Sequence, residues 1–250
     1  MAADLAARPY TKAPPAPIAT VYNWTGFYGG LNGGYGWGSS TGNLVGNSGG
    51  IAIPAAIAGG TIPTALGVRP EGWLGGAQIG YNWQYNQVVF GLEADIQGAG
   101  IKQSVGISRA AVVGLLPTFS TGSSELDWFG TVRGRIGYAW NTVLLYATGG
   151  LAYGGVSDSA SSATVPPPPA GFGSNGATRV GWTAGAGVEW AFTPNWTLKG
   201  EYLHVDLGSS NTTVVFPADF LVYRFQHQYD MVRIGVNYKF TTGGAVVAKY

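Results

Sequence analysis

Hydrophobic and polar residues alternate with a period of two along most of the chain from Thr25 onward. This is the period of a β-strand, because successive side chains of a strand point to opposite faces of the sheet. In the last such segment, Ile234 and Val236 alternate with Arg233 and Asn237. The pattern predicts eight strands, over residues 25–38, 71–84, 87–98, 126–140, 142–155, 177–192, 196–207 and 228–240.

Three connections between these strands are tight turns flanked by aromatic residues. They lie near Tyr85-Asn86, Asn141-Thr142 and Thr193-Pro194-Asn195, and Trp140 and Trp190 stand on the strand ends beside two of them. Amphipathic rings are favoured at the membrane–water boundary, and barrels of the outer membrane carry girdles of them there. The turns therefore indicate one rim of a membrane barrel.

The other four connections are long and cover residues 39–70, 99–125, 156–176 and 209–227, so short and long connections alternate along the chain. Outer-membrane barrels have this arrangement, with short periplasmic turns, longer extracellular loops and an even number of strands. We therefore predict an all-β fold: an eight-stranded antiparallel transmembrane β-barrel with short periplasmic turns and four long extracellular loops. Both chain ends then lie in the periplasm.

The polar face of the strands separates this barrel from a soluble β-sandwich, which would show the same alternation. That face is crowded with glycine, of which the chain has 42, and this suits a narrow, filled interior. An eight-stranded barrel is just wide enough for its own side chains, so we expect no steady diffusion pore. Six bases and five acids on this face can pair in a lumenal charge network of Glu93, Asp95, Asp127, Arg133, Arg135, Arg179, Glu189, Lys199, Glu201, Arg233 and Lys239.

Composition excludes several kinds of chemistry. The chain of 250 residues has a net charge of +1 and no cysteine, so it has no disulfide framework, thiolate nucleophile or cysteine-ligated zinc. The absence of a Lys/Arg cluster leaves nucleic-acid binding without an electrostatic basis. The best serine, histidine and aspartate collection is His204 and Asp206 with Ser209 and Ser210 nearby, and its spacing supports no triad. We predict no enzymatic activity and no cofactor.

The N-terminal segment lacks any period and is rich in proline. If Met1-Ala2 ends an Ala-x-Ala cleavage site, the mature protein starts at Ala3. Residues 1–21 are then a periplasmic tail, and its extended, partly polyproline II portion of about 19 residues can reach ~60 Å. The predicted barrel covers 22–240, and a short C-terminal tail covers 241–250.

The last strand ends in the pattern of an outer-membrane insertion signal. The signal comprises Arg233, Gly235, Tyr238 and Phe240, a polar residue and a glycine followed by two aromatics one residue apart. The barrel assembly machinery is thought to bind such a strand by β-augmentation. Ten residues follow Phe240, so Phe240 and Tyr250 are both candidates for the recognised end.

Three short segments carry a resemblance to a known family. They are Ala3-Asp4-Leu5, the block Asn23-Trp-Thr-Gly-Phe-Tyr-Gly-Gly30 and the ending Tyr238-Lys-Phe240. With the Gly-rich strands, they resemble alphaproteobacterial outer-membrane proteins of the Omp25/Omp31 type. The resemblance implies an abundant surface barrel that stabilises the envelope. It also implies that the mature Ala3-Asp4 terminus can be joined to peptidoglycan. Because haem binding occurs in the family, His227 is a weak candidate for an axial ligand.

The predicted loops are less polar than extracellular loops usually are. Residues 43–66 carry no charge, and 110–116 and 214–222 are also apolar. Exposed apolar patches usually mean packing or partners. Either these loops fold over one another and extend the barrel, or they mediate self-association or binding of another surface component. The first interpretation is favoured for 110–125, and both stay open for 43–66.

Taken together, the sequence predicts a structural protein of the bacterial cell outer membrane that supports envelope integrity and is tethered to peptidoglycan. Its expected partners are outer-membrane lipid and lipopolysaccharide, the barrel assembly machinery and peptidoglycan. Two alternatives stay open: a surface receptor for haem or another small molecule, and a narrow porin-like channel.

Overall fold

The computed structural model describes residues 22–49, 52–111, 116–164 and 170–240. The predicted tails, with Ala3, Asp4 and Tyr250, lie outside these residues. The elements are β1 (Gly26–Asn47), α1 (Ala52–Ala58), β2 (Ala65–Val68), β3 (Glu71–Tyr85), β4 (Val88–Arg109), β5 (Thr118–Trp140), β6 (Val143–Thr164), β7 (Ala170–Ala191), β8 (Trp196–Val215) and β9 (Phe220–Lys239).

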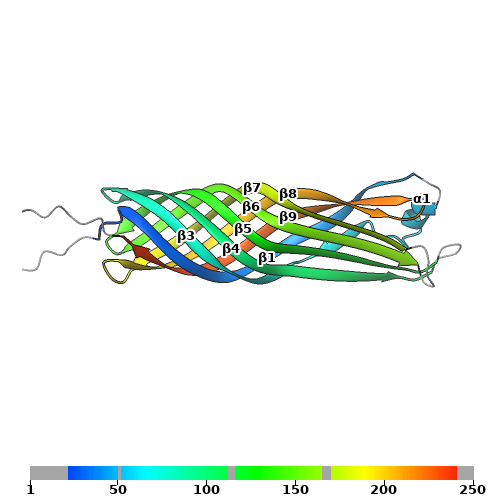
Figure 1. Cartoon of the computed structure of the whole chain (residues 1–250), viewed down its shortest axis with the longest axis horizontal. Helices are drawn as coiled ribbons and strands as arrows, with labels where there is room; N and C mark the ends of the chain where they lie inside the picture. Colours follow the sequence, from blue (N-terminus) through cyan, green and yellow to red (C-terminus); the bar gives the residue numbers. More distant parts are fainter. Residues whose placement is uncertain (1–21, 50–51, 112–115, 165–169, 241–250) are drawn as a thin grey trace, which may run out of the picture.

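The strands form one antiparallel sheet that closes into a ring (Figure 1). Each strand from β3 to β8 pairs with the next, β1 pairs with β3, and β9 pairs back to β1, for example at Gly33 and Ile234. The all-β antiparallel barrel is therefore confirmed. The described residues contain nine strands, whereas the sequence predicts eight. The additional strand is β2, which lies inside the predicted loop 39–70 and pairs with β1 alone.

The extent of the predicted long loops is wrong, because the strands continue far into them. β4 runs to Arg109 and β5 begins at Thr118, and these two residues are register partners. Most of the predicted loop 99–125 is thus sheet, and the same holds for 156–176 and 209–227. Runs rich in serine, threonine and glycine show no hydrophobic alternation, although their backbone groups pair as well as any others. Strand ends of this kind leave no periodic signal.

The tight turns use the left-handed backbone region. Asn86 and Asn141 both have φ of 53°, each as the first residue of a two-residue connection. Hairpins of this length favour turns with positive φ, which asparagine tolerates better than most residues. The third connection, after β7, is held by Thr193, whose Oγ1 accepts the backbone N–H of Trp196 at 2.9 Å. All three turns lie where the sequence predicts them.

Two belts of aromatic rings mark the outer surface of the barrel. Near the turns, Tyr138 packs on Trp140 with ring centroids 4.6 Å apart, and Tyr238 packs on Phe240 at 5.3 Å. Further along the strands, Tyr35 meets Trp73 at 5.2 Å, Trp128 meets Tyr153 at 6.1 Å and Trp182 meets His204 at 5.3 Å. We call these the turn-side belt and the upper belt.

Between the belts the outward side chains are large, apolar and exposed. On β4, Phe90, Leu92 and Ile96 are each about half exposed to solvent. Such a surface would be unfavourable in water and is favourable in lipid. About ten residues of β4 separate the belts, which at ~3.3 Å per residue and a tilt of ~40° gives an apolar band of ~25 Å. Among the described residues, no helix is long and apolar enough to cross a membrane.

Side chains fill the lumen in successive layers along the strands. A cluster around Trp24, Leu144 and Tyr146 closes the turn end. Charged residues follow, and then an apolar layer that includes Ile101 and Phe129. Beyond it lie a small polar layer and a second apolar layer. This second layer, which we call the outer layer, lies at the end of the barrel opposite the tight turns, which we call the outer end.

The apolar segment 43–66 contributes to the outer layer. Helix α1 sits at the outer end of the barrel (Figure 1), and Ile53, Ile62 and Leu66 are buried there with Phe225. This favours the interpretation in which the loops extend the barrel. Self-association through the remaining exposed apolar side chains at this end stays a prediction.

The outer layer makes a testable contribution to stability. Replacing buried Phe225 by alanine leaves a cavity and is expected to cost about 3–5 kcal/mol locally. Limited proteolysis of the folded protein in detergent micelles should then cut the strand ends around this layer, while heat-modifiable gel mobility shows that the rest of the barrel stays folded. Phe220→Ala, in the same strand but at a 41% exposed side chain, is the matched control. Equal protease resistance of both variants would contradict this account.

Candidate functional site

Five strands bring eight charged side chains together inside the barrel. Residues two apart on a strand share a face, so Arg133 and Arg135 of β5 both point inward. The sheet register places opposite charges side by side, for example Glu93 beside Arg133 and Glu201 beside Arg233. The lumenal charge cluster consists of Glu93 and Asp95 from β4, Arg133 and Arg135 from β5, Glu189 from β7, Lys199 and Glu201 from β8, and Arg233 from β9.

Arg133 is the centre of this cluster. Its Nη1 donates to Glu201 Oε2 at 2.6 Å, and its Nη2 donates to Asp95 Oδ2 at 3.0 Å and to Glu93. Arg233 contacts two of the same carboxylates, with its Nη2 2.8 Å from Asp95 Oδ2 and 3.3 Å from Glu201 Oε1. Two guanidinium groups thus share two carboxylates, which ties β4, β5, β8 and β9 together across the lumen.

Lys199 and Arg135 connect the remaining acids. The Nζ of Lys199 lies 3.0 Å from Glu93 Oε1 and 3.2 Å from Glu201 Oε1. Arg135 donates from Nη2 to Glu189 Oε2 at 2.7 Å, and its guanidinium carbon lies 4.2 Å from the centre of the Tyr146 ring. The four bases and four acids therefore form one neutral network that spans the lumen.

The cluster is buried, and this makes its pairing necessary. Each of the eight side chains is at most 4% exposed. A charge taken out of water is tolerated only when partners and hydrogen bonds compensate it, and removal of one partner of a buried pair typically costs about 3–5 kcal/mol. The cluster is consequently a cross-link whose members depend on one another.

Uncharged residues complete the network. Tyr28 donates its hydroxyl to Glu93 Oε2 at 2.8 Å. Asn32 Nδ2 donates to Gln78 Oε1 at 2.9 Å, and Asn237 Nδ2 donates to Glu189 Oε1 at 2.9 Å. Sequence reasoning did not single these residues out, because amides and hydroxyls on a polar face look the same in a lumen and in water. Their inward position on the alternating face was the only available signal.

Glycine provides the space that the large lumenal side chains need. A Cβ at Gly80 would lie 2.4 Å from the Tyr28 hydroxyl, and one at Gly187 would lie 2.5 Å from the hydroxyl of Tyr146. Non-bonded Cβ atoms essentially never come this close to other heavy atoms, so even alanine at these positions would require the ring and the nearby backbone to shift. The glycine-rich polar face is thus shaped by the rings and guanidinium groups that cross the lumen.

Three residues predicted in the network lie outside it. A β-bulge between Leu126 and Trp128 changes which side chains of β5 face inward, so that Asp127 points outward and is exposed. Arg179 lies further out on β7 and donates to the backbone oxygen of Ser209 at 3.2 Å. Lys239 lies at the turn end, where its Nζ is 4.2 Å from the centre of the Tyr22 ring.

The prediction that His227 is a loop residue is wrong. It lies in β9 with its ring fully buried, in the polar layer between the two outer apolar layers, so it offers no surface position for haem. Ser210 Oγ lies 2.6 Å from Asp158 Oδ2 and 3.0 Å from His227 Nε2. Asp158 Oδ2 is 3.2 Å from the same nitrogen. A serine-protease triad uses both ring nitrogens, so these contacts do not form one.

The other histidine also has a structural partner. His204 Nδ1 lies 2.8 Å from Asp230 Oδ1, which also accepts the Tyr202 hydroxyl at 2.6 Å. Asp206 instead accepts a hydrogen bond from Gln228 at 3.0 Å, so the collection around His204 is not assembled. Across the described ranges, no group of three or more His, Cys, Asp or Glu side chains could hold a metal ion.

The residues of the predicted insertion signal fall into two environments. Tyr238 and Phe240 belong to the turn-side belt, and Tyr238 also packs on Trp196 at 5.1 Å. Arg233 is a member of the lumenal charge cluster. Gly235 lies between them opposite Asn32 of β1. Recognition by the assembly machinery stays a prediction.

Comparison with known proteins gives a consistent result. The family model for the outer membrane protein β-barrel domain matches residues 12–240. The chain is 37% identical to the 31 kDa outer-membrane immunogenic protein of Brucella melitensis biotype 1, over 96% of this chain and 93% of that protein. It is 29% identical to the 25 kDa outer-membrane immunogenic protein of Brucella abortus biovar 1, with 96% and 92% covered. It is also 29% identical to a 22 kDa outer membrane protein of Rhizobium leguminosarum bv. viciae, with 91% and 83% covered.

Solved structures give only a loose likeness. The outer membrane protease OmpT from Escherichia coli aligns with a TM-score of 0.48 and 9% identity, over 88% of this chain and 98% of that one. The outer membrane protein OprG from Pseudomonas aeruginosa aligns with a TM-score of 0.41 and 8% identity, over 88% and 99%. At this level, neither carries an argument about activity.

The charge cluster predicts a large loss of stability when one base is removed. Arg133→Met leaves Glu93, Asp95 and Glu201 short of a partner, and we expect the free energy of unfolding to fall by about 3–5 kcal/mol. Urea unfolding in lipid vesicles, followed by tryptophan fluorescence, measures this change. Arg179→Met, which removes one bond to a backbone oxygen, should cost at most about 1 kcal/mol. Similar losses for the two variants would refute a central role of the cluster.

Proposed function

The chain belongs to the outer membrane protein β-barrel family, among the Omp25/Omp31-type proteins of the bacterial outer membrane, and from this premise we propose that it is a closed structural barrel. Its role in this proposal is to support the integrity of the envelope. The observation that carries the proposal is the lumenal charge cluster, in which four bases and four acids neutralise one another. A diffusion pore needs a continuous column of water through the lumen. Here paired charges and apolar layers fill that space with side chains.

The membrane-spanning unit in this proposal is an eight-stranded barrel made of β1 and β3–β9, with β2 as part of its outer extension. The turn-side belt lies at the periplasmic boundary and the upper belt at the extracellular boundary. The long strand ends beyond the upper belt then replace extracellular loops. The ring of pairings and the apolar band between the belts support this arrangement.

Attachment to the cell wall is the second part of the proposal. The described chain starts at the turn end, where the backbone N–H of Tyr22 donates to Asn141 Oδ1 at 3.1 Å. Trp24 is buried in the cluster that closes this end. We propose that the tail before Tyr22 lies on the periplasmic side, because 19 residues from Ala3, when fully extended, have the length to span about 60 Å toward peptidoglycan.

One observation favours a second candidate, a receptor for a small apolar molecule. A cavity of about 300 Å³ lies at the outer end, lined by Ile53 and Ala56 of α1, by Ile62 and by Phe216. Pockets of this size and polarity occur at ligand sites. Haem ligation by His227 is not part of this candidate, because that ring is buried.

The structural role can be tested in cells that lack the protein. Loss of the gene should increase sensitivity to detergent, and the full chain should restore resistance. A variant without residues 4–21 keeps Ala3 and should insert, as shown by heat-modifiable mobility, but it should no longer co-purify with peptidoglycan, because Asp4 and the tail that spans the distance to the cell wall are missing. A muropeptide on Ala3 of the full chain, detected by mass spectrometry, is the direct expectation. Unchanged detergent resistance without the gene would contradict the structural role, and quantitative extraction of the full chain by detergent would contradict the tether.

A further inference from the structure

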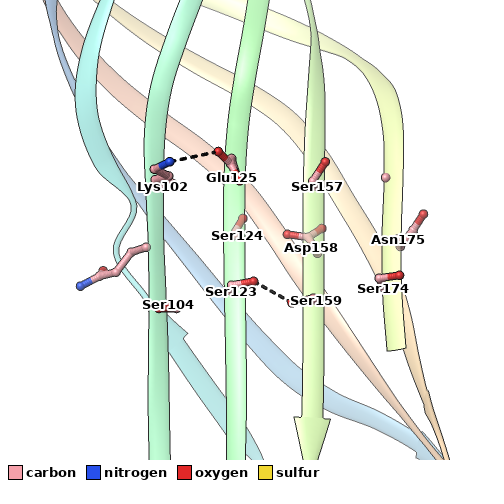
Figure 2. A pocket seen from close by; sticks show the side chains of 12 residues that line it. Lys102, Ser104, Ser123, Ser124, Glu125, Ser157, Asp158, Ser159, Ser174 and Asn175 are labelled. Carbon is pink, nitrogen blue, oxygen red and sulfur yellow. Dashed lines mark hydrogen bonds and ion pairs between the residues drawn. The ribbon is translucent and has the colours of Figure 1, made fainter. Parts of the chain in front are cut away.

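A row of serine hydroxyls crosses the outward face of the barrel beyond the upper belt. Ser104 of β4 is the register partner of Ser123 of β5, Ser123 pairs with Ser159 of β6, and Ser159 pairs with Ser174 of β7. Figure 2 shows the row across the four neighbouring strands, with the hydroxyls of Ser123 and Ser159 2.7 Å apart. One residue type thus recurs at one height on four consecutive strands.

The neighbouring rows keep this surface polar and almost uncharged. On the membrane side, Lys102 lies 3.7 Å from Glu125, in the same row as Ser157 (Figure 2). On the outer side, the hydroxyls of Thr121 and Ser161 are 2.6 Å apart. Among the described residues that line this surface, Lys102 is the one cation and it is paired with Glu125, so the surface is a poor site for a free phosphate or an acidic peptide.

The row lies in a hollow of about 650 Å³ on the barrel wall. The hollow arises because serine side chains are short and Gly176 has none. Aromatic rings stand at both borders. Trp128 and Tyr153 of the upper belt lie on the membrane side, exposed Phe172 lies in the row of Thr121 and Ser161, and exposed Phe119 lies one row beyond it. We call this feature, bounded by Lys102, Glu125 and the row of Ser104, Ser123, Ser159 and Ser174, the serine hollow.

The chemistry of the serine hollow matches a sugar. Hydroxyl groups both donate and accept hydrogen bonds, as the hydroxyls of a saccharide require, and aromatic rings offer flat apolar contacts to sugar C–H groups. A lipid tail could not satisfy the donor and acceptor positions that the Ser123–Ser159 hydrogen bond leaves open, which is unfavourable. A hydroxyl-rich surface that is framed by rings, and whose Lys102 is paired with Glu125, is thus best satisfied by a carbohydrate.

The position of the hollow selects the carbohydrate. It faces sideways from the barrel wall, in the rows directly beyond the upper belt, and not upward into the medium. In the bacterial outer membrane, the sugars of lipopolysaccharide surround a barrel at this height. We propose that the serine hollow binds a core sugar of lipopolysaccharide next to its lipid anchor. This inference rests on the outer-membrane location and on the orientation proposed above, with the upper belt at the extracellular boundary, and it does not depend on whether the lumen is closed.

The opposite wall offers a matched control surface. Ser39 of β1 and Ser209 and Thr213 of β8 are exposed hydroxyl residues in the outer part of the barrel. Their register partners on β9 are Gln228, Gln226 and Val222, so they form no hydroxyl row.

The test compares two triple variants of the full chain, folded in detergent micelles and checked by heat-modifiable mobility. One is Ser123→Ala, Ser159→Ala and Ser174→Ala, and the control is Ser39→Ala, Ser209→Ala and Thr213→Ala. The probes are purified lipopolysaccharide truncated to its inner core and lipid A without core sugars, titrated by native mass spectrometry. A further variant, Ser159→Phe, fills the hollow and keeps strand propensity.

We expect about tenfold weaker binding of the core-bearing lipopolysaccharide by the row variant and by Ser159→Phe, from the loss of several hydrogen bonds. The control variant should bind it like the parent, and lipid A should bind equally to all four proteins. Unchanged binding of the core-bearing probe by both hollow variants would overturn the proposal. An equal loss for lipid A would also overturn it, because the sugar would then not be what the hollow recognises.

Discussion

Charge buried in a narrow lumen has to be compensated, and this requirement governs most of the barrel. Arg133 and Arg233 share Asp95 and Glu201, while Lys199 and Arg135 engage Glu93 and Glu189. These contacts exist only in one strand register, because a shift of one residue would send every charged side chain into the lipid. The cluster thus fixes the register of the five strands that contribute to it. Glycines such as Gly80 leave room for the large side chains next to the cluster.

The polarity of the two faces of the sheet reverses along the strands. Within the apolar band, the outward side chains are apolar and the inward ones are polar or charged. Beyond the upper belt, the inward side chains include the apolar layer around Phe225, and many of the outward ones on β5 and β6 are serine and threonine. Bulges at Leu126 and near Gly208 lie close to this reversal. The barrel consequently continues beyond the upper belt as a β-cylinder with an apolar core, and α1 lies at its end.

The period-two pattern was sufficient to predict the strands within the apolar band and the inward position of eight of the eleven charged residues. Both follow directly from the alternation of side chains in a pleated strand. The predicted lumenal position of Asp127 was wrong because a bulge changes which side chains of β5 face inward, and no residue type in the sequence marks that bulge. The prediction that His227 lies in a loop was wrong because a polar strand segment beyond the apolar band has the same residue pattern as a loop. The contacts of α1 with the outer layer could not be predicted either, since apolar residues between strands fit both a plug and an exposed patch.

The central claim is that paired lumenal charges and packed layers close the barrel, and conductance in planar lipid bilayers tests it most directly. Purified, folded protein of the full chain should insert and give no steady ion conductance, because the charge cluster and the apolar layers occupy its lumen. A large and stable single-channel conductance from the same preparation would contradict the closed lumen and the structural role that depends on it.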